Sequence, residues 1–185
     1  MRYAQMALTA MVMVYLTGVC VADTLSTTLD GTGYISGIVR EQTRGRVLVH
    51  HSIPEQVQQS RIDFAFLSIP GVRLSGNAGR VTVNLLRLTT PWSADRVSWT
   101  SPWQRAGGDF DTTEATCFAL ASDDAYNLAF DVTDWAKQWQ AGAINCGMIL
   151  TRPRDEGGGF GDEAAVLRQA LAQARVKFYF TPVQQ

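Results

Sequence analysis

The chain has 185 residues, which favours a single domain and is long enough to bury a hydrophobic core. Its 16 lysines and arginines nearly balance its 17 aspartates and glutamates, so the sequence shows neither the basic face of a nucleic-acid-binding protein nor an acidic tail. Apolar residues make up 46% of the chain, which is ordinary for a globular protein and excludes a disordered one.

Residues 1–22 have the three parts of a secretory signal peptide. Arg2 carries the only charge, an apolar run extends from Met6 to about Val19, and small residues precede a cleavage position after Ala22. The apolar run is shorter than the ~20 residues that a membrane span needs. We therefore expect no permanent membrane span, and a mature protein that is secreted and lies outside the cell, in the periplasm or at the cell surface.

The cysteines bear on this expectation. A lipoprotein would use Cys20, but the bulky Val19 precedes it where a small residue is expected. Cleavage leaves Cys117 and Cys146, and two cysteines in an oxidising compartment predict a disulfide. Its loop of about 30 residues would stabilise the fold by about 3 kcal/mol in the chain-entropy model. The alternative is two small buried thiols.

From residue 24 onward, short apolar runs alternate with turn signals. The segment 60–67 alternates polar and apolar residues with a period of two, which predicts that Ile62, Phe64 and Phe66 face the core and Ala65 faces outward. The other strand candidates are residues 46–50, 80–85, 117–121, 126–130, 146–151 and 175–180. About eight or nine short antiparallel strands indicate an all-β sandwich or barrel.

Two short helices interrupt the strands. The first is predicted for residues 133–141, with Thr133 as its N-cap and Gly142 as the stop at its C-terminus. The second is predicted for residues 162–174, where apolar residues recur at helical spacing after a glycine-rich loop.

Two sequence blocks resemble the DNRLRE domain family, which is also described as carbohydrate-binding module family 96. Residues 90–103, TPWSADRVSWTSPW, are similar to the family's W-S-E-x-x-V-T-W-N-x-P segment, and residues 130–150 are similar to its D-V-T…W…G…N-x-G-L-L-L block. The resemblance covers about residues 30–180. The motif positions that it marks as structural are Trp92, Trp99, Asp131, Thr133, Trp139, Gly142, Asn145 and Gly147.

The resemblance implies that residues 23–185 form one jelly-roll β-sandwich, secreted and non-catalytic. The leading hypothesis is a module that binds a polysaccharide or a cell-surface or matrix glycan. The alternative is a structural or adhesion protein of the cell envelope or extracellular matrix that acts through protein–protein assembly. An exposed aromatic row on one sheet face would favour the first hypothesis, and a large apolar patch around residues 160–174 would favour the second.

Sugar binding needs exposed aromatic rings, because the C–H face of a pyranose buries apolar area against them. Trp103 follows a proline and precedes a polar, glycine-rich loop, so it is the leading candidate for an exposed platform. Tyr34 and Tyr126 are weaker candidates. The other tryptophans of the mature chain are expected in the core, and these are Trp92, Trp99, Trp135 and Trp139.

The sequence offers little for metal binding or catalysis. His50 and His51 are adjacent, so on a strand they would point to opposite faces, one packed and one exposed, and could not chelate one metal as a pair. Acidic loop residues that could serve a structural Ca²⁺ are Asp109, Asp111, Asp123 and Asp124, but without EF-hand spacing. No nucleophile–base pair, zinc-protease motif or P-loop is present in the sequence, so we predict a non-enzyme without a cofactor.

Overall fold

The computed structural model describes residues 22–39, 42–73, 83–115, 117–122, 125–152, 160 and 163–183. Residues 1–21 of the predicted signal peptide, and Asp123 and Asp124, lie outside this part. The described strands are β1 (Asp23–Thr28), β2 (Gly31–Val39), β3 (Gln42–His50), β4 (Ser60–Val72), β5 (Asn84–Leu88), β6 (Phe110–Glu114), β7 (Cys117–Ser122), β8 (Ala125–Asp131), β9 (Met148–Thr151) and β10 (Arg175–Pro182). The described helices are α1 (Glu55–Gln58), α2 (Thr133–Gln140) and α3 (Ala164–Leu171). None of them is long and apolar enough to cross a membrane.

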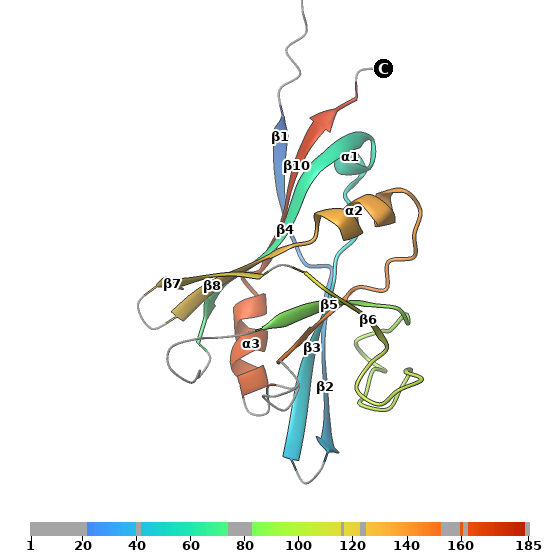
Figure 1. Ribbon diagram of the computed structural model, residues 1–185, viewed down its shortest axis with the longest axis vertical. Coiled ribbons are helices and arrows are strands. Elements are labelled where there is room, and N and C mark those ends of the chain that lie inside the picture. Colours follow the sequence, from blue (N-terminus) through green and yellow to red (C-terminus); the bar gives the residue numbers. More distant parts are fainter. Residues whose placement is uncertain are drawn as a thin grey trace, which may run out of the picture.

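The strands form two five-stranded antiparallel sheets (Figure 1). Sheet A has the order β1-β10-β4-β8-β7, and sheet B has the order β2-β3-β9-β5-β6. If β2 and β7 are set aside, the other eight strands, renumbered along the chain, have the orders 1-8-3-6 and 2-7-4-5. This is the topology of a jelly roll. The predicted all-β sandwich is confirmed, with ten described strands instead of eight or nine and with the additional helix α1.

The main core lies between the sheets. Side chains of alternate residues on both sheets are almost fully buried there, among them Val47, Val49, Leu67, Leu128, Phe130, Leu150, Val176 and Phe178. Helix α3 contacts β3 and β4, one strand of each sheet, so it covers the gap between them (Figure 1). Its Leu167 and Leu171 are buried in this core. Within Ala164–Leu171, Val166 is the large apolar side chain at the surface, 37% exposed. The helix therefore completes the core and presents no large apolar patch.

A second, smaller cluster covers the outer face of sheet B. It contains Leu48, Leu86, Leu88 and Ile149, which alternate with the residues that face the main core. The loop of residues 89–109 lies over them, and its tryptophans and Val97 pack against the sheet. Trp103 is only 7% exposed, and its indole N–H donates a hydrogen bond to the carbonyl oxygen of Ser98 at 2.9 Å. The prediction that Trp103 forms an exposed platform is therefore wrong, because the loop folds back onto the sheet.

Asp109 organises this loop. Its carboxylate accepts hydrogen bonds from the backbone N–H of Gln104 (2.7 Å), the backbone N–H of Arg105 (2.9 Å) and the hydroxyl of Thr90 (2.9 Å). Burial of the carboxyl opposes ionisation, but these hydrogen bonds outweigh it and hold the pKa of Asp109 below its ordinary value. Asp111 accepts from the backbone N–H of Thr113. Among the described residues, no group of three His, Cys, Asp or Glu side chains is placed to hold a metal ion.

The two described cysteines are free. Cys117 on β7 packs against the core between the sheets, whereas Cys146 precedes β9 and belongs to the cluster on the outer face of sheet B. The two cysteines thus belong to different clusters and do not form the predicted disulfide in this structure. Burial raises the pKa of both thiols.

Candidate functional site

A β-bulge in β4 decides which side chains reach the outer face of sheet A. In the register of β4 against β10, Phe64 lies opposite Tyr179. The next pair joins Ile62 to Phe180, so Asp63 is an extra residue on β4. Because side chains of a strand alternate between faces, one extra residue reverses the alternation on the two sides of the bulge.

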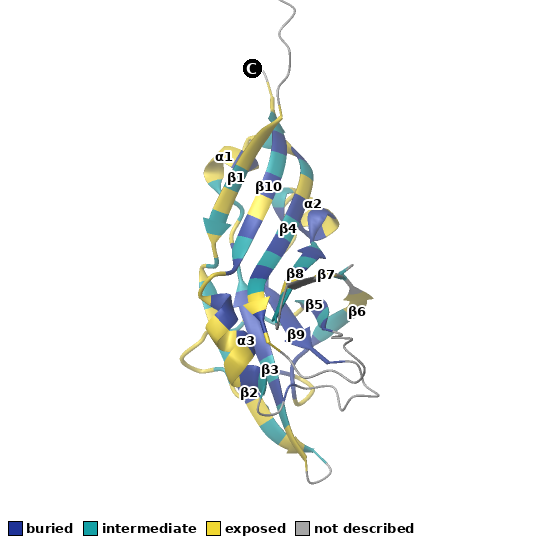
Figure 2. Cartoon of the chain, turned by 90° about the vertical axis from the view of Figure 1, so that its left-hand side faces the viewer, coloured by how far each residue is buried: buried dark blue, intermediate teal, exposed yellow. Residues whose placement is uncertain are grey.

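The bulge turns two phenylalanines outward. Ile62 faces the core as predicted, but beyond the bulge it is Ala65 and Leu67 that are fully buried. Phe64 is 55% exposed and Phe66 is half-buried. The prediction that Phe64 and Phe66 face the core, with Ala65 outside, is therefore wrong. Figure 2 shows the alternation of buried and accessible positions along β4 and β10.

Phe64, Phe66 and Tyr179 form what we call the aromatic strip. The ring centroids of Phe64 and Phe66 are 6.5 Å apart, with their planes inclined by 21°. Tyr179 meets Phe66 edge to face at 6.4 Å, and the Lys177 ammonium lies 5.1 Å from the centroid of the Tyr179 ring. The strip joins two neighbouring strands of sheet A into one continuous aromatic surface.

Fixed polar groups stand beside the strip. Arg61 forms an ion pair with Asp63 at 2.9 Å, and the Thr181 hydroxyl donates a hydrogen bond to the other carboxylate oxygen of Asp63 at 2.7 Å. The hydrogen bond from Thr181, followed by that from Arg61, holds the pKa of Asp63 below its ordinary value. The carboxylate is thus a preorganised hydrogen-bond acceptor next to Phe64.

The strands on either side add further polar positions to the same face. Thr24 and Ser26 of β1 lie opposite Tyr179 and Lys177 of β10, and directly opposed residues share a face of the sheet. On the other side, Asp131 of β8 lies opposite Phe66. Hydroxyls therefore border the aromatic strip on the β1 side, and a carboxylate borders it on the β8 side.

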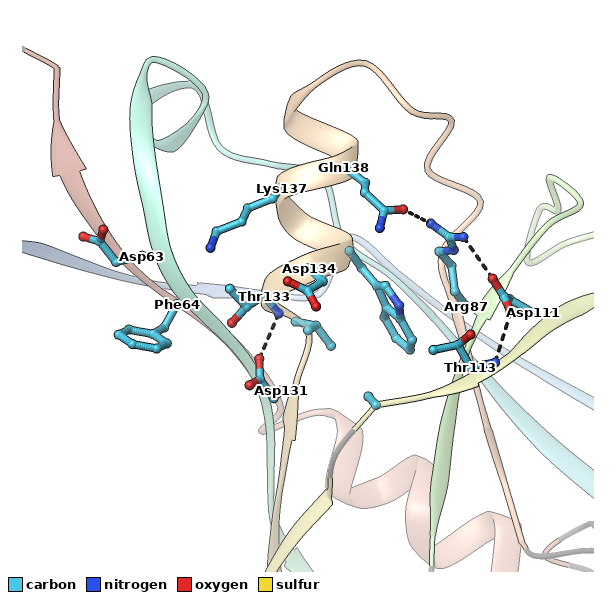
Figure 3. A pocket seen from close by; sticks show the side chains of 13 residues that line it. Asp63, Phe64, Arg87, Asp111, Thr113, Asp131, Thr133, Asp134, Lys137 and Gln138 are labelled. Carbon is cyan, nitrogen blue, oxygen red and sulfur yellow. Dashed lines mark hydrogen bonds and ion pairs between the residues drawn. The ribbon is translucent and has the colours of Figure 1, made fainter.

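Two cavities adjoin the strip. An apolar hollow of about 500 Å³ is lined by Ala22, Arg61, Ile62, Asp63, Phe64, Lys137 and Tyr179. A polar cleft of about 380 Å³ lies between β4, helix α2 and strands β5 and β6 (Figure 3). Asp63, Phe64 and Lys137 line both cavities.

The polar cleft has a partly fixed lining. Arg87 donates hydrogen bonds to Gln138 and to Asp111, the latter at 3.1 Å (Figure 3). Asp131 accepts a hydrogen bond from the backbone N–H of Thr133 at 3.0 Å. Asp134, in the first turn of α2, is exposed. The cleft thus offers carboxylate, amide and guanidinium groups, the usual partners of sugar hydroxyls.

The tyrosines singled out from the sequence lie away from the strip. Tyr34 on β2 is half-buried, and the Arg168 guanidinium lies 5.5 Å from its ring centroid. Tyr126 on β8 is half-buried, lies opposite Val72 and packs against the main core. The structure therefore does not bring Tyr34, Tyr126 and Trp103 together.

Motif residues at the start of α2 attach the helix to β4. The Thr133 hydroxyl accepts a hydrogen bond from the backbone N–H of Ala65 at 2.9 Å and donates to its carbonyl oxygen at 3.4 Å. Thr133 is the first residue of α2 and not its N-cap, so that prediction is wrong, because the hydroxyl serves β4. Gly142, with φ of +99°, follows the end of the helix as predicted.

A second group of motif residues fixes the entry into β9. The Asn145 side chain donates to the carbonyl oxygen of His51 at 2.7 Å and accepts from the backbone N–H of Gly147 at 2.9 Å. A Cβ at Gly147 would lie 2.6 Å from the carbonyl oxygen of Val49, so only glycine fits. The Trp92 indole donates to the carbonyl oxygen of Cys146 at 2.9 Å. The two other motif tryptophans pack in the clusters, Trp139 buried between the sheets and Trp99 half-buried on the outer face of sheet B.

The two histidines lie at the end of β3. His51 is buried, as expected for one histidine of the pair, whereas His50 is half-buried with a side chain that is 33% exposed, less than expected. The His51 ring lies 5.7 Å from that of Phe178, and its Nε2 is 3.0 Å from the Thr27 hydroxyl oxygen. Burial lowers the pKa of His51, although the Asp30 carboxylate opposes this effect.

No protein-family model matches the chain, and no curated protein is significantly similar to it. The resemblance to the DNRLRE family therefore stays a prediction that depends on the two motif blocks.

Proposed function

We propose that this protein binds a polysaccharide, or a cell-surface or matrix glycan, on the outer face of sheet A. The observation that carries this proposal is the aromatic strip, in which Phe64 is 55% exposed beside Phe66 and Tyr179. Contiguous exposed apolar surface marks an interaction site more often than scattered single residues do.

The surroundings of the strip favour a sugar over a purely apolar ligand. A pyranose has an apolar C–H face that packs on an aromatic ring, and a rim of hydroxyls that must keep their hydrogen bonds. Asp63 is fixed by Arg61 and Thr181 next to Phe64, so an acceptor is ready where such a hydroxyl would lie.

The competing assembly hypothesis expected its interface around residues 160–174. In the described part of that segment, Phe160, Leu167 and Leu171 are buried in the main core. That segment therefore gives the assembly hypothesis no support. A protein partner on the aromatic strip is the remaining form of this alternative, and the same experiment separates it from glycan binding.

The test is affinity gel electrophoresis of the exported protein in gels that contain a panel of polysaccharides, with pull-down on insoluble ones. We expect retardation by one glycan class, weakened about tenfold or more in Phe64→Ala and Tyr179→Ala, since a loss of ~1.4 kcal/mol corresponds to a factor of ten. The control variant is Ile38→Ala, which removes apolar area from a side chain that is 78% exposed on β2.

Circular dichroism and urea unfolding must show that the variants are folded. Folded protein that no glycan retards would refute the proposal. So would retardation that both strip variants leave unchanged.

A further inference from the structure

The hollow on the strip and the polar cleft adjoin each other, because Asp63, Phe64 and Lys137 line both. We call the two cavities together the groove. Figure 3 shows Lys137 extending from α2 toward β4, whereas Gln138 extends from the other side of the helix toward Arg87. At about 500 and 380 Å³, each cavity is in the range of a small-ligand site, ~300–1,000 Å³. A ligand that fills both is longer than one sugar ring.

The charges of the cleft discriminate between glycans. Four carboxylates line it, those of Asp63, Asp111, Asp131 and Asp134, against two cations, Arg87 and Lys137. Arg87 is paired with Asp111 at 3.1 Å, and Asp63 is paired with Arg61, outside the cleft lining. Among the described residues that line the cleft, Asp131 and Asp134 thus outnumber the remaining cation, Lys137, and this end of the groove carries a net negative charge.

Hydrogen bonding favours the same kind of ligand as the charges do. Ionised carboxylates only accept hydrogen bonds, so the hydroxyls of a neutral sugar satisfy Asp131 and Asp134 by donating to them. A carboxylate or sulfate on the sugar has no proton to donate, and it would add a like charge in a partly desolvated cleft.

We infer that the glycan is a linear chain without carboxylate or sulfate groups, held along its length from Tyr179 over Phe64 into the cleft beside α2. This inference depends on the proposed function and names the ligand class of the same site. The net charge of the whole chain is only −1, so the discrimination against acidic chains comes from the cleft.

The preference for uncharged over acidic glycans is tested with pairs of polymers that share a backbone and differ in charge. Affinity electrophoresis compares hydroxyethylcellulose with carboxymethylcellulose, and a galactomannan with the same galactomannan oxidised to uronate at its primary hydroxyls. We expect the neutral member of a retained pair to bind at least tenfold more tightly. In the double variant Asp131→Asn, Asp134→Asn, the ratio should fall below about threefold, because asparagine keeps an acceptor oxygen for the Thr133 N–H and removes the charge.

The matched control is Asp95→Asn, which removes one charge from a side chain that is 71% exposed, paired with Arg96 and absent from the lining of the groove. It should leave the ratio unchanged. Equal or tighter binding of the acidic member would overturn the inference and leave glycan binding intact. If no polymer of the pairs or of the wider panel is bound by folded protein, the proposed function falls and the inference falls with it.

Chain length gives a second readout. Titration calorimetry with oligosaccharides cut from the retained polymer should show affinity that rises by tenfold or more from two rings to four or five, since only the longer chains reach the cleft. Gln138→Ala, at the cleft end, should weaken the longer oligosaccharides and leave the two-ring fragment unaffected. Affinity that does not depend on chain length would show that the ligand is held at one ring. It would overturn the inference that the glycan extends from the hollow into the cleft.

Discussion

The burial of Trp103 lets us estimate how much the cluster on the outer face of sheet B contributes to the stability of the fold. With 7% of its surface exposed, its ring is almost entirely removed from water. A buried tryptophan removes about 150–250 Å² from water, which at ~25 cal/mol per Å² corresponds to about 4–6 kcal/mol. A surface loop can partly close the cavity, so we expect Trp103→Ala to lower the free energy of unfolding by about 3–5 kcal/mol.

Unfolding in urea is monitored by far-UV circular dichroism. The free energies of unfolding are compared between variants whose m-values are equal. Trp103→Phe is the matched control, since it keeps an aromatic ring and loses only the hydrogen bond to Ser98 and part of the volume. It should cost about 1–2 kcal/mol. If Trp103→Ala stays within about 1 kcal/mol of the natural protein, the ring does not support the cluster and the burial argument is refuted. Under the proposed function, the folded fraction of Trp103→Ala should bind glycan as the natural protein does, because the ring lies on the opposite sheet from the strip.

Three further predictions concern the core, the α2 junction and pH. Leu167→Ala in α3 should lower the free energy of unfolding by about 2–5 kcal/mol, measured in urea. Val166→Ala, on the exposed side of the helix, should change it by less than about 0.5 kcal/mol. Equal effects of the two substitutions would place α3 outside the core. Thr133→Val should cost about 1–3 kcal/mol and Thr133→Ser much less in the same assay, because the hydroxyl accepts the hydrogen bond of the buried Ala65 N–H. Similar losses in the two variants would contradict that role. The pKa of His51 is lowered from 6.5 in the folded chain, so the unfolded chain binds the proton first and stability falls as pH drops below about 6.5. His51→Gln should make the free energy of unfolding less dependent on pH between about pH 7 and 5. An unchanged slope would contradict the role of His51 in the loss of stability.

The fold class could be predicted because its signals are local. Period-two runs broken by turn residues predict strands, and the helical spacing around residues 133–141 and 162–174 predicts α2 and α3 to within a few residues. Gly142 marks the end of α2 because a positive φ is inexpensive only for glycine.

The candidate site could not be predicted because it depends on the pairing of distant residues. Two apolar series interleave in β4, one through Ile62, Phe64 and Phe66 and one through Ala65 and Leu67. Either can face a core, and the bulge at Asp63, defined by pairing with β10, selects the second for most of the strand. The sequence favours the bulkier series, of which Phe64 and Phe66 lie outside.

The burial of Trp103 had a signal in the sequence that the turn residues around it obscured. Strands β3 and β9 contain unbroken apolar runs, residues 47–49 and 148–150. Such runs are typical of strands that are covered on both faces. They indicate that some segment must lie over the outer face of sheet B, and the loop of residues 89–109 supplies the tryptophans that do so.

The unlike outer faces of the two sheets limit the valency of the molecule. In the described part of the chain, the loop of residues 89–109 occupies the outer face of sheet B, and the aromatic strip lies on that of sheet A. A sandwich that binds through one face holds one polymer strand per molecule and forms no crosslink by itself. Under the proposed function, the protein added to a solution of the polysaccharide would decorate the chains without gelling them. A network would require protein molecules that are joined to one another.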